Sequence, residues 1–156
     1  ISKVSADPDT PGNMIVEMEG IALYINFNPQ EIEDLAPEEI KTKAKQLILD
    51  KGLDRFPAAG VIYSQKDGDV WRIRPVVWVR RIDTLFLETA CGSGTTALGL
   101  VLALKKGSSI IDVPILQPTN LPIKVSVKFD GKEFGYTQIS GPVEKLGEGI
   151  PMVLSV

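Results

Sequence analysis

Residues 91–107 read CGSGTTALGLVLALKKG, an apolar run with a cysteine and two glycines in front of it. The two lysines and the glycine that end this stretch are typical of a last helical turn and a helix stop. A helix that is apolar on every side is buried in the core. The sequence therefore predicts a central buried helix that begins at Cys91.

The start of this helix places a thiol beside unpaired backbone N–H groups and the positive end of the helix dipole. Cysteine pKa values at such positions can fall from about 8.5 to roughly 3.5–7.5, so we expect a favoured thiolate. Gly92 and Gly94 would let a carboxylate or phosphate approach the N–H groups. Because the chain has one cysteine and no histidine, acid–base chemistry at neutral pH depends on Cys91. The alternative is that Cys91 is a small core residue.

The rest of the chain predicts mainly strands. An amphipathic helix is expected over residues 36–51, with a proline in its first turn and an apolar stripe. Two Asp-Gly pairs, at residues 67–68 and 130–131, predict tight hairpins. The expected strands are residues 14–19, 21–27, 61–63, 70–79, 123–129 and 133–136. The pattern indicates one α+β domain over residues 1–156, a strand-rich sheet or partial barrel wrapped around the central helix.

Composition excludes several classes of function. A net charge of −3 without a Lys/Arg-rich run argues against nucleic acid as a partner. No apolar stretch reaches the roughly 20 residues of a membrane span. A single unpaired thiol and the lack of a signal peptide favour the cytoplasm. The acidic residues lack the spacing of a metal site, so no metal is expected.

The segment from Ala90 to Thr95, opening a buried helix after a strand expected to carry Glu88 and Thr89, resembles a cysteine motif of the diaminopimelate epimerase and proline racemase superfamily. The resemblance covers most of the chain and is to the C-terminal half of that family. Further pieces fall in the expected order: Arg55-Phe56-Pro57 before Val61-Ile62-Tyr63, the strand Val70–Val79, Ser140-Gly141-Pro142-Val143, and Gly147-Glu148-Gly149.

The resemblance implies an amino-acid racemase or epimerase that needs no cofactor. Two cysteines face each other across the substrate, and one removes the α-proton while the other delivers a proton to the opposite face. Cys91 would be one of these acid–base groups. The backbone of Gly92, Ser93, Gly94 and Thr95 would then hold the substrate carboxylate. Beside the resemblance, the residues suggest Glu88 for the thiol or a substrate amine, and Thr89 and Ser93 as hydroxyl donors to a carboxylate. The alternatives are a solvated Glu88 at a strand end and hydroxyl groups that only cap the turn.

Departures from the family pattern bear on the substrate. Val61 stands where diaminopimelate epimerases have an asparagine, and residues 81–85 replace their Glu-Arg-Gly run. Glu88, three residues before the cysteine, makes the chain more similar to the histidine racemases. The resemblance thus implies an amino-acid or carboxylate substrate, with histidine as the narrower suggestion.

The second base is absent from these 156 residues. The resemblance implies that it lies in a missing N-terminal half-domain, without which this half would be inactive and would expose an apolar face suited to self-association, including a homodimer. Two alternatives stay open: an isomerase of a non-amino-acid carboxylate on the same fold, and a catalytically silent anion-binding or assembly domain. The silent domain predicts a Cys91 pKa near or above the ordinary value.

Overall fold

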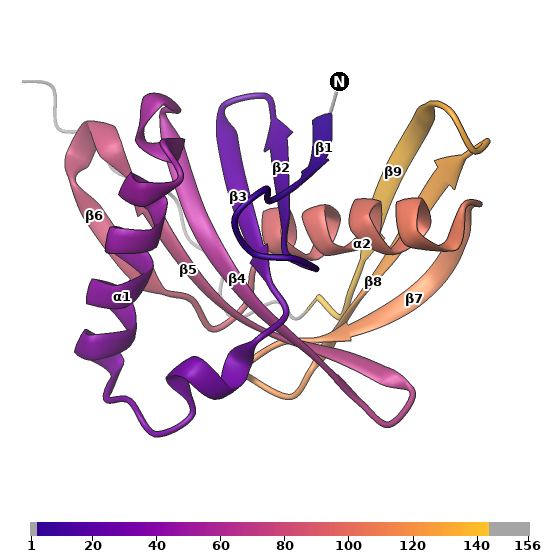
Figure 1. Cartoon of the computed structure of the whole chain (residues 1–156). Coiled ribbons are helices and arrows are strands. Elements are labelled where there is room, and N and C mark those ends of the chain that lie inside the picture. Colours follow the sequence, from indigo (N-terminus) through magenta and orange to yellow (C-terminus); the bar gives the residue numbers. More distant parts are fainter. Residues whose placement is uncertain (1–2, 144–156) are drawn as a thin grey trace, which may run out of the picture.

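The chain folds into one curled sheet with a helix on each face (Figure 1). The structure is a computed structural model and describes residues 3–143. Eight strands are hydrogen-bonded in the order β1-β2-β3-β4-β5-β7-β8-β9, and β6 pairs with β5 beside this path. The expected α+β fold, a partial barrel around a central helix, is confirmed. The Gly147–Gly149 segment lies outside the described residues.

The elements have the following bounds. The strands are β1 Lys3–Ala6, β2 Met14–Met18, β3 Ile21–Asn26, β4 Ala58–Asp67, β5 Val70–Val79, β6 Thr84–Leu87, β7 Ile110–Leu116, β8 Pro122–Phe129 and β9 Phe134–Ser140. The helices are α1 Pro37–Asp50 and α2 Gly92–Lys106, with short 3-10 turns η1 Pro29–Ile32, η2 Leu53–Arg55 and η3 Arg80–Ile82.

Helix α2 fills the concave side of the sheet. Its apolar side chains pack against strands on both sides of β5, with Leu23 of β3 and Ile62 of β4 on one side and Val125 of β8 on the other. The contact with β8 is so close that a Cβ on Gly99 would lie 2.6 Å from a methyl group of Val125. The predicted buried helix is therefore confirmed, and its glycine permits the close approach of helix and sheet.

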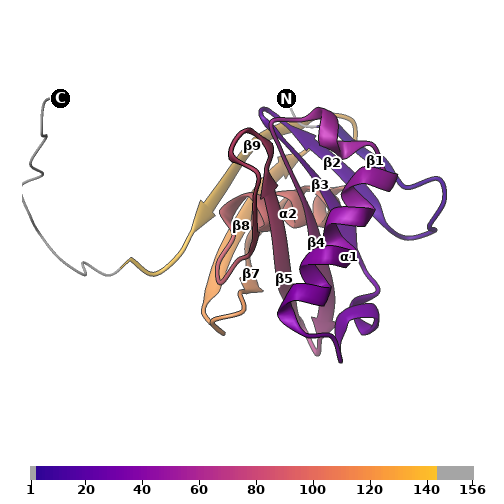
Figure 2. The same ribbon diagram turned by 90° about the vertical axis from the view of Figure 1, so that its left-hand side faces the viewer.

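Helix α1 covers part of the convex side, as Figure 2 shows from a second direction. Three residues of the predicted stripe, Ile40, Ala44 and Ile48, are fully buried, and Leu47 is partly buried against them. Strands β3 and β4 thus have apolar residues on both faces. Each faces α2 with one set of alternate residues and α1 with the other.

The hairpins and the strand before Cys91 differ in detail from the predictions. Gly68 has a φ of +59° in the β4–β5 hairpin, as expected for a tight turn. The β8–β9 turn is longer than a two-residue hairpin, because β9 begins only at Phe134 and the Asp130 carboxylate accepts the N–H groups of Lys132 and Glu133. Strand β6 ends at Leu87, so Glu88 and Thr89 belong to the loop that follows.

Strand β5 is the point at which the sheet divides. On one edge it pairs with β7 through Trp71 and Arg72, and with β6 through residues 76–79. Between these two pairings, the N–H of Glu88 donates to the carbonyl of Pro75 at 3.0 Å. The segment that leads to Cys91 therefore enters the concave side of the sheet through the opening between β6 and β7.

Among the described residues, no helix is long and apolar enough to cross a membrane.

Candidate functional site

Cys91 is the N-cap residue of α2, the position that its sequence context predicts. Its backbone is extended, with φ −139° and ψ 104°, and its Sγ accepts the N–H of Gly94 at 3.2 Å. The side chain is buried, and only 3% of the residue is exposed. The cysteine therefore replaces the usual oxygen of a capping residue with sulfur.

The Cys91 sulfur has two polar neighbours in the first turn of α2. The N–H of Gly94 points at Sγ, and the Ser93 hydroxyl lies 3.4 Å from the same atom. A Cβ on Gly94 would lie 2.8 Å from Ile62 Cδ1 and 3.2 Å from Sγ, so any side chain here would have to displace the end of Ile62 or the sulfur. Gly92 and Ser93 are half-buried, and their N–H groups belong to the first turn, which lacks partners within the helix.

Thr95 binds the backbone carbonyl of Cys91. Its N–H and its hydroxyl both donate to the Cys91 carbonyl, at 3.0 and 2.8 Å, and the residue is fully buried. Both donors of Thr95 and the N–H of Gly94 are thus engaged, and no described hydrogen bond occupies the N–H groups of Gly92 and Ser93.

The thiol is protonated at neutral pH, contrary to the sequence-based expectation of a thiolate. Burial raises the pKa of Cys91, and the nearby Glu88 carboxylate raises it further, to about 11. The Ser93 hydroxyl and the Gly94 N–H act in the opposite direction and are outweighed. Proximity to a helix N-terminus does not guarantee a thiolate when the sulfur is desolvated.

The Glu88→Gln variant should lower the pKa of Cys91, because it removes a negative charge beside the thiol while keeping the side-chain size. Alkylation of Cys91 by iodoacetamide, measured against pH, should shift its midpoint downward. The rate at pH 8 should rise about tenfold for each unit of the shift. Glu19→Gln, in the exposed turn between β2 and β3, is the control and should leave the profile unchanged. An unchanged profile for Glu88→Gln would contradict the assigned role of Glu88.

Glu88 is half-buried and shifts the pKa of the thiol, whereas Thr89 is exposed. The predicted site residues Cys91, Gly92, Ser93 and Gly94 form one turn, with Glu88 beside it. Thr89 lies in the same loop, and no described hydrogen bond links its side chain to Cys91.

A mainly apolar hollow of about 460 Å³ lies beside the start of α2. Ala90 and Gln117, on either side of Cys91, form part of its wall. Ile139 of β9 links the hollow to the helix, because a Cβ on Gly92 would lie 3.1 Å from its side chain. Its rim includes large apolar side chains that are exposed, namely Leu121, Ile139 and Val143.

Gln117, at the end of β7, is a site residue that the sequence analysis missed. It is 1% exposed, and its side chain accepts a hydrogen bond from the Cys91 N–H at 2.9 Å. Gln117 precedes the turn that contains Pro118, and a glutamine in a turn usually faces solvent. The sequence carried no signal for its burial, since the contact spans 26 positions.

Across residues 3–143, no group of three or more acidic or cysteine side chains is arranged to hold a metal ion.

Comparisons with known proteins identify the family of this chain. The model of the family described as "Histidine racemase CntK N-terminal domain" matches residues 2–151. Two proteins named histidine racemase, from two strains of Fusobacterium nucleatum subsp. nucleatum, are 29% and 30% identical to this chain over 135 residues. The alignments cover 86% of this chain and 46% of each relative. The chain thus spans about half the length of the curated relatives that it matches.

The matching family model describes an N-terminal domain, whereas the sequence analysis related the chain to a C-terminal half. The suggested likeness to the histidine racemases within the wider superfamily is confirmed. The chain belongs to the histidine racemase family, and the part of the family that it matches is the N-terminal domain.

Proposed function

We propose that this chain is one half of an amino-acid racemase that acts on histidine, and that Cys91 is one of the two acid–base groups. The observation that carries the proposal is the position of the single thiol, at the N-terminus of α2 beside a hollow, in a chain that the histidine racemase family model matches over residues 2–151. The function of the two Fusobacterium relatives, as their names give it, supports histidine as the substrate.

In the proposed reaction no cofactor takes part. A thiolate from the other half removes the α-proton of one enantiomer, and the Cys91 thiol donates its proton to the opposite face of the α-carbon. The pKa of about 11 for Cys91 supports the donor role, because the thiol carries a proton at neutral pH. In the reverse direction Cys91 accepts the proton and ends again as a thiol.

The substrate carboxylate would lie against the N–H groups of Gly92 and Ser93. These groups begin α2, and the helix dipole favours negative charge there. The same N–H groups would stabilise the charge that develops when the α-proton leaves. Glu88 would then act on the thiol, because its carboxylate raises the pKa of Cys91.

The second half would cover the apolar rim of the hollow. Large exposed apolar side chains at Leu121, Ile139 and Val143 surround it. Covering the rim would exclude water from the thiol and bring the second base opposite Cys91.

One observation favours a second function. A Cys91 pKa above the ordinary value is what we expected of a catalytically silent anion-binding domain. In that case the N-terminus of α2 would bind a carboxylate without proton transfer.

Exchange of the histidine α-proton for deuterium, followed by NMR in heavy water, distinguishes the two functions. We expect exchange with the complete protein and none with residues 1–156 alone, which contain a single cysteine. Diaminopimelate and other free amino acids are the controls for substrate. A complete protein that binds histidine without exchange would support the silent domain and contradict the racemase.

A further inference from the structure

Gln117 is the buried polar side chain that contacts Cys91 from outside its own loop. Its carboxamide has a complete set of neighbours: Oε1 accepts the Cys91 N–H at 2.9 Å, and Nε2 donates to Thr95 Oγ1 and to the Ile115 carbonyl, both at 3.0 Å. The orientation of the amide is fixed, because an N–H can only donate and a carbonyl can only accept.

These contacts close into a ring around the backbone of Cys91. The Cys91 N–H donates to Gln117, Gln117 donates to the Thr95 hydroxyl, and that hydroxyl donates to the Cys91 carbonyl at 2.8 Å. Cys91 is 3% exposed, Gln117 1% and Thr95 not at all. Both backbone polar groups of the cysteine are thus held by buried, uncharged partners that do not touch its sulfur.

Other side chains of similar size cannot complete this ring. Methionine would leave the Cys91 N–H unpaired in the core, which is costly. Glutamate could still accept that N–H, but its second oxygen would face the Ile115 carbonyl and add a negative charge near the thiol. The position therefore needs both an acceptor and a donor, which a carboxamide supplies.

We propose that Gln117 is a positioning residue for Cys91, which fixes both backbone groups of the cysteine and thereby the place of its sulfur relative to the substrate. The inference rests on the proposed acid–base role of Cys91. Gln117 also occupies the Cys91 N–H, which leaves the N–H groups of Gly92 and Ser93 for the carboxylate. Its loop forms part of the wall of the hollow, so the same residue joins the thiol to the binding surface.

The test uses the complete protein with Gln117→Met, Gln117→Glu and Thr95→Val, and with Gln65→Met as the matched control at an exposed position of β4. Histidine α-proton exchange gives kcat and KM, and peptide mass spectrometry follows alkylation of Cys91 against pH. Small displacements of a reacting group can cost about 100-fold in rate. We expect Gln117→Met and Thr95→Val to lower kcat by roughly 10- to 100-fold with KM changed less than about threefold.

Two further results separate positioning from a purely structural role. Because Gln117 and Thr95 belong to one ring, the double variant should lose little more than either single variant. Gln117→Glu should move the midpoint of Cys91 alkylation to higher pH, since a carboxylate is added near the thiol. Gln117→Glu keeps the size of the side chain, so its kcat and its Cys91 alkylation profile test the positioning role if Gln117→Met fails to fold.

The outcomes distinguish this inference from the proposed function. Exchange that survives Cys91→Ser would overturn the acid–base role of Cys91, and the positioning role with it. If Cys91→Ser abolishes exchange while folded variants of Gln117 and Thr95 keep the normal kcat and alkylation profile, only the positioning role is overturned.

Discussion

Replacing Cys91 with serine in the complete protein should abolish histidine racemisation while the fold is retained. A serine hydroxyl is too weak an acid to exchange protons with an α-carbon at neutral pH. General acid–base groups contribute about 10²–10⁴-fold to a rate, so we expect a loss of at least that size. The measurement is α-proton exchange by NMR, together with circular dichroism to verify folding. Histidine turnover near the normal rate in Cys91→Ser would refute the role.

Ser93→Ala is the matched control for this prediction. The Ser93 hydroxyl lies 3.4 Å from the Cys91 sulfur and occupies the same helical turn, but it need not transfer a proton. Its removal takes away a contact that lowers the pKa of Cys91. We therefore expect a several-fold change in rate, far smaller than that for Cys91→Ser. Equal losses in the two variants would mean that the turn, and not the sulfur, limits the reaction.

The centre of the fold could be predicted from the sequence because its signals are local. Residues 97–104 are apolar on all sides, and a lysine pair and Gly107 follow, so the buried helix and its end were confirmed. Gly107 has a φ of +75°, which explains why the helix stops there. Strand β6 was placed less well, because its four residues end at Leu87 and Glu88 continues toward the concave side of the sheet.

The chemical state of the thiol could not be predicted, because it depends on how completely the folded chain buries the sulfur and on where the Glu88 side chain lies. The cap position of Cys91 was correct, and the helix start alone favours a thiolate. Burial of Cys91 in the core and the Glu88 carboxylate reverse the direction of the pKa shift. Gln117 was missed for the same reason, since its contact with Cys91 depends on the path of the β7–β8 loop.

The cysteine motif did not distinguish the N-terminal domain of the family from its C-terminal half. In the proposed reaction, a cysteine followed by two glycines at the start of a buried helix would serve proton transfer and carboxylate binding. Both halves of a two-base enzyme need these features, so residues 91–95 do not distinguish one half from the other. The family model is informative here because it matches residues 2–151 and so includes the strands before the cysteine.

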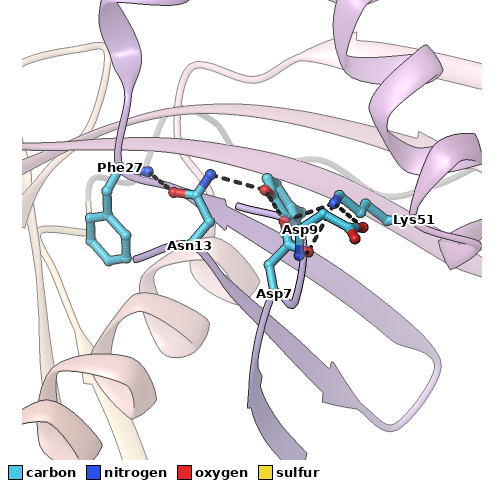
Figure 3. A network of polar contacts seen from close by, with 6 residues as sticks. Asp7, Asp9, Asn13, Phe27 and Lys51 are labelled. Carbon is cyan, nitrogen blue, oxygen red and sulfur yellow. Dashed lines mark hydrogen bonds and ion pairs between the residues drawn. The ribbon is translucent and has the colours of Figure 1, made fainter. Parts of the chain in front are cut away.

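A buried network of polar side chains connects β1, β3 and the end of α1 (Figure 3). The Asp7 side chain is completely buried and accepts hydrogen bonds from Tyr24 Oη at 2.6 Å and from Lys51 Nζ at 2.8 Å. Asn13 donates to the same tyrosine oxygen and accepts the N–H of Phe27. Asp9, which is exposed, also pairs with Lys51 at 3.0 Å.

Asp7 is charged in this network in spite of its burial. Burial alone would raise the pKa of Asp7, but the hydrogen bonds from Lys51, Tyr24 and the Asp9 N–H outweigh it and lower the pKa to about 2. The folded-state pKa is below the unfolded value of 3.8, so Asp7 contributes stability above that value. The contribution, about 2 kcal/mol at 1.36 kcal/mol per unit, is lost as the pH falls through about 2.

Asp7→Asn should therefore lower the free energy of unfolding by about 3–5 kcal/mol at pH 7, because Lys51 and Tyr24 lose a buried charged partner. Urea unfolding followed by circular dichroism measures this loss. Asp9→Asn is the control: it removes the exposed partner of the same lysine, and we expect a loss below about 1 kcal/mol. The difference in stability between the original chain and Asp7→Asn should shrink by up to about 2 kcal/mol as the pH falls through 3.8 and 2, since protonation of Asp7 then removes the same charge. Equal effects of the two substitutions at pH 7 would show that burial of Asp7 adds nothing to the pair.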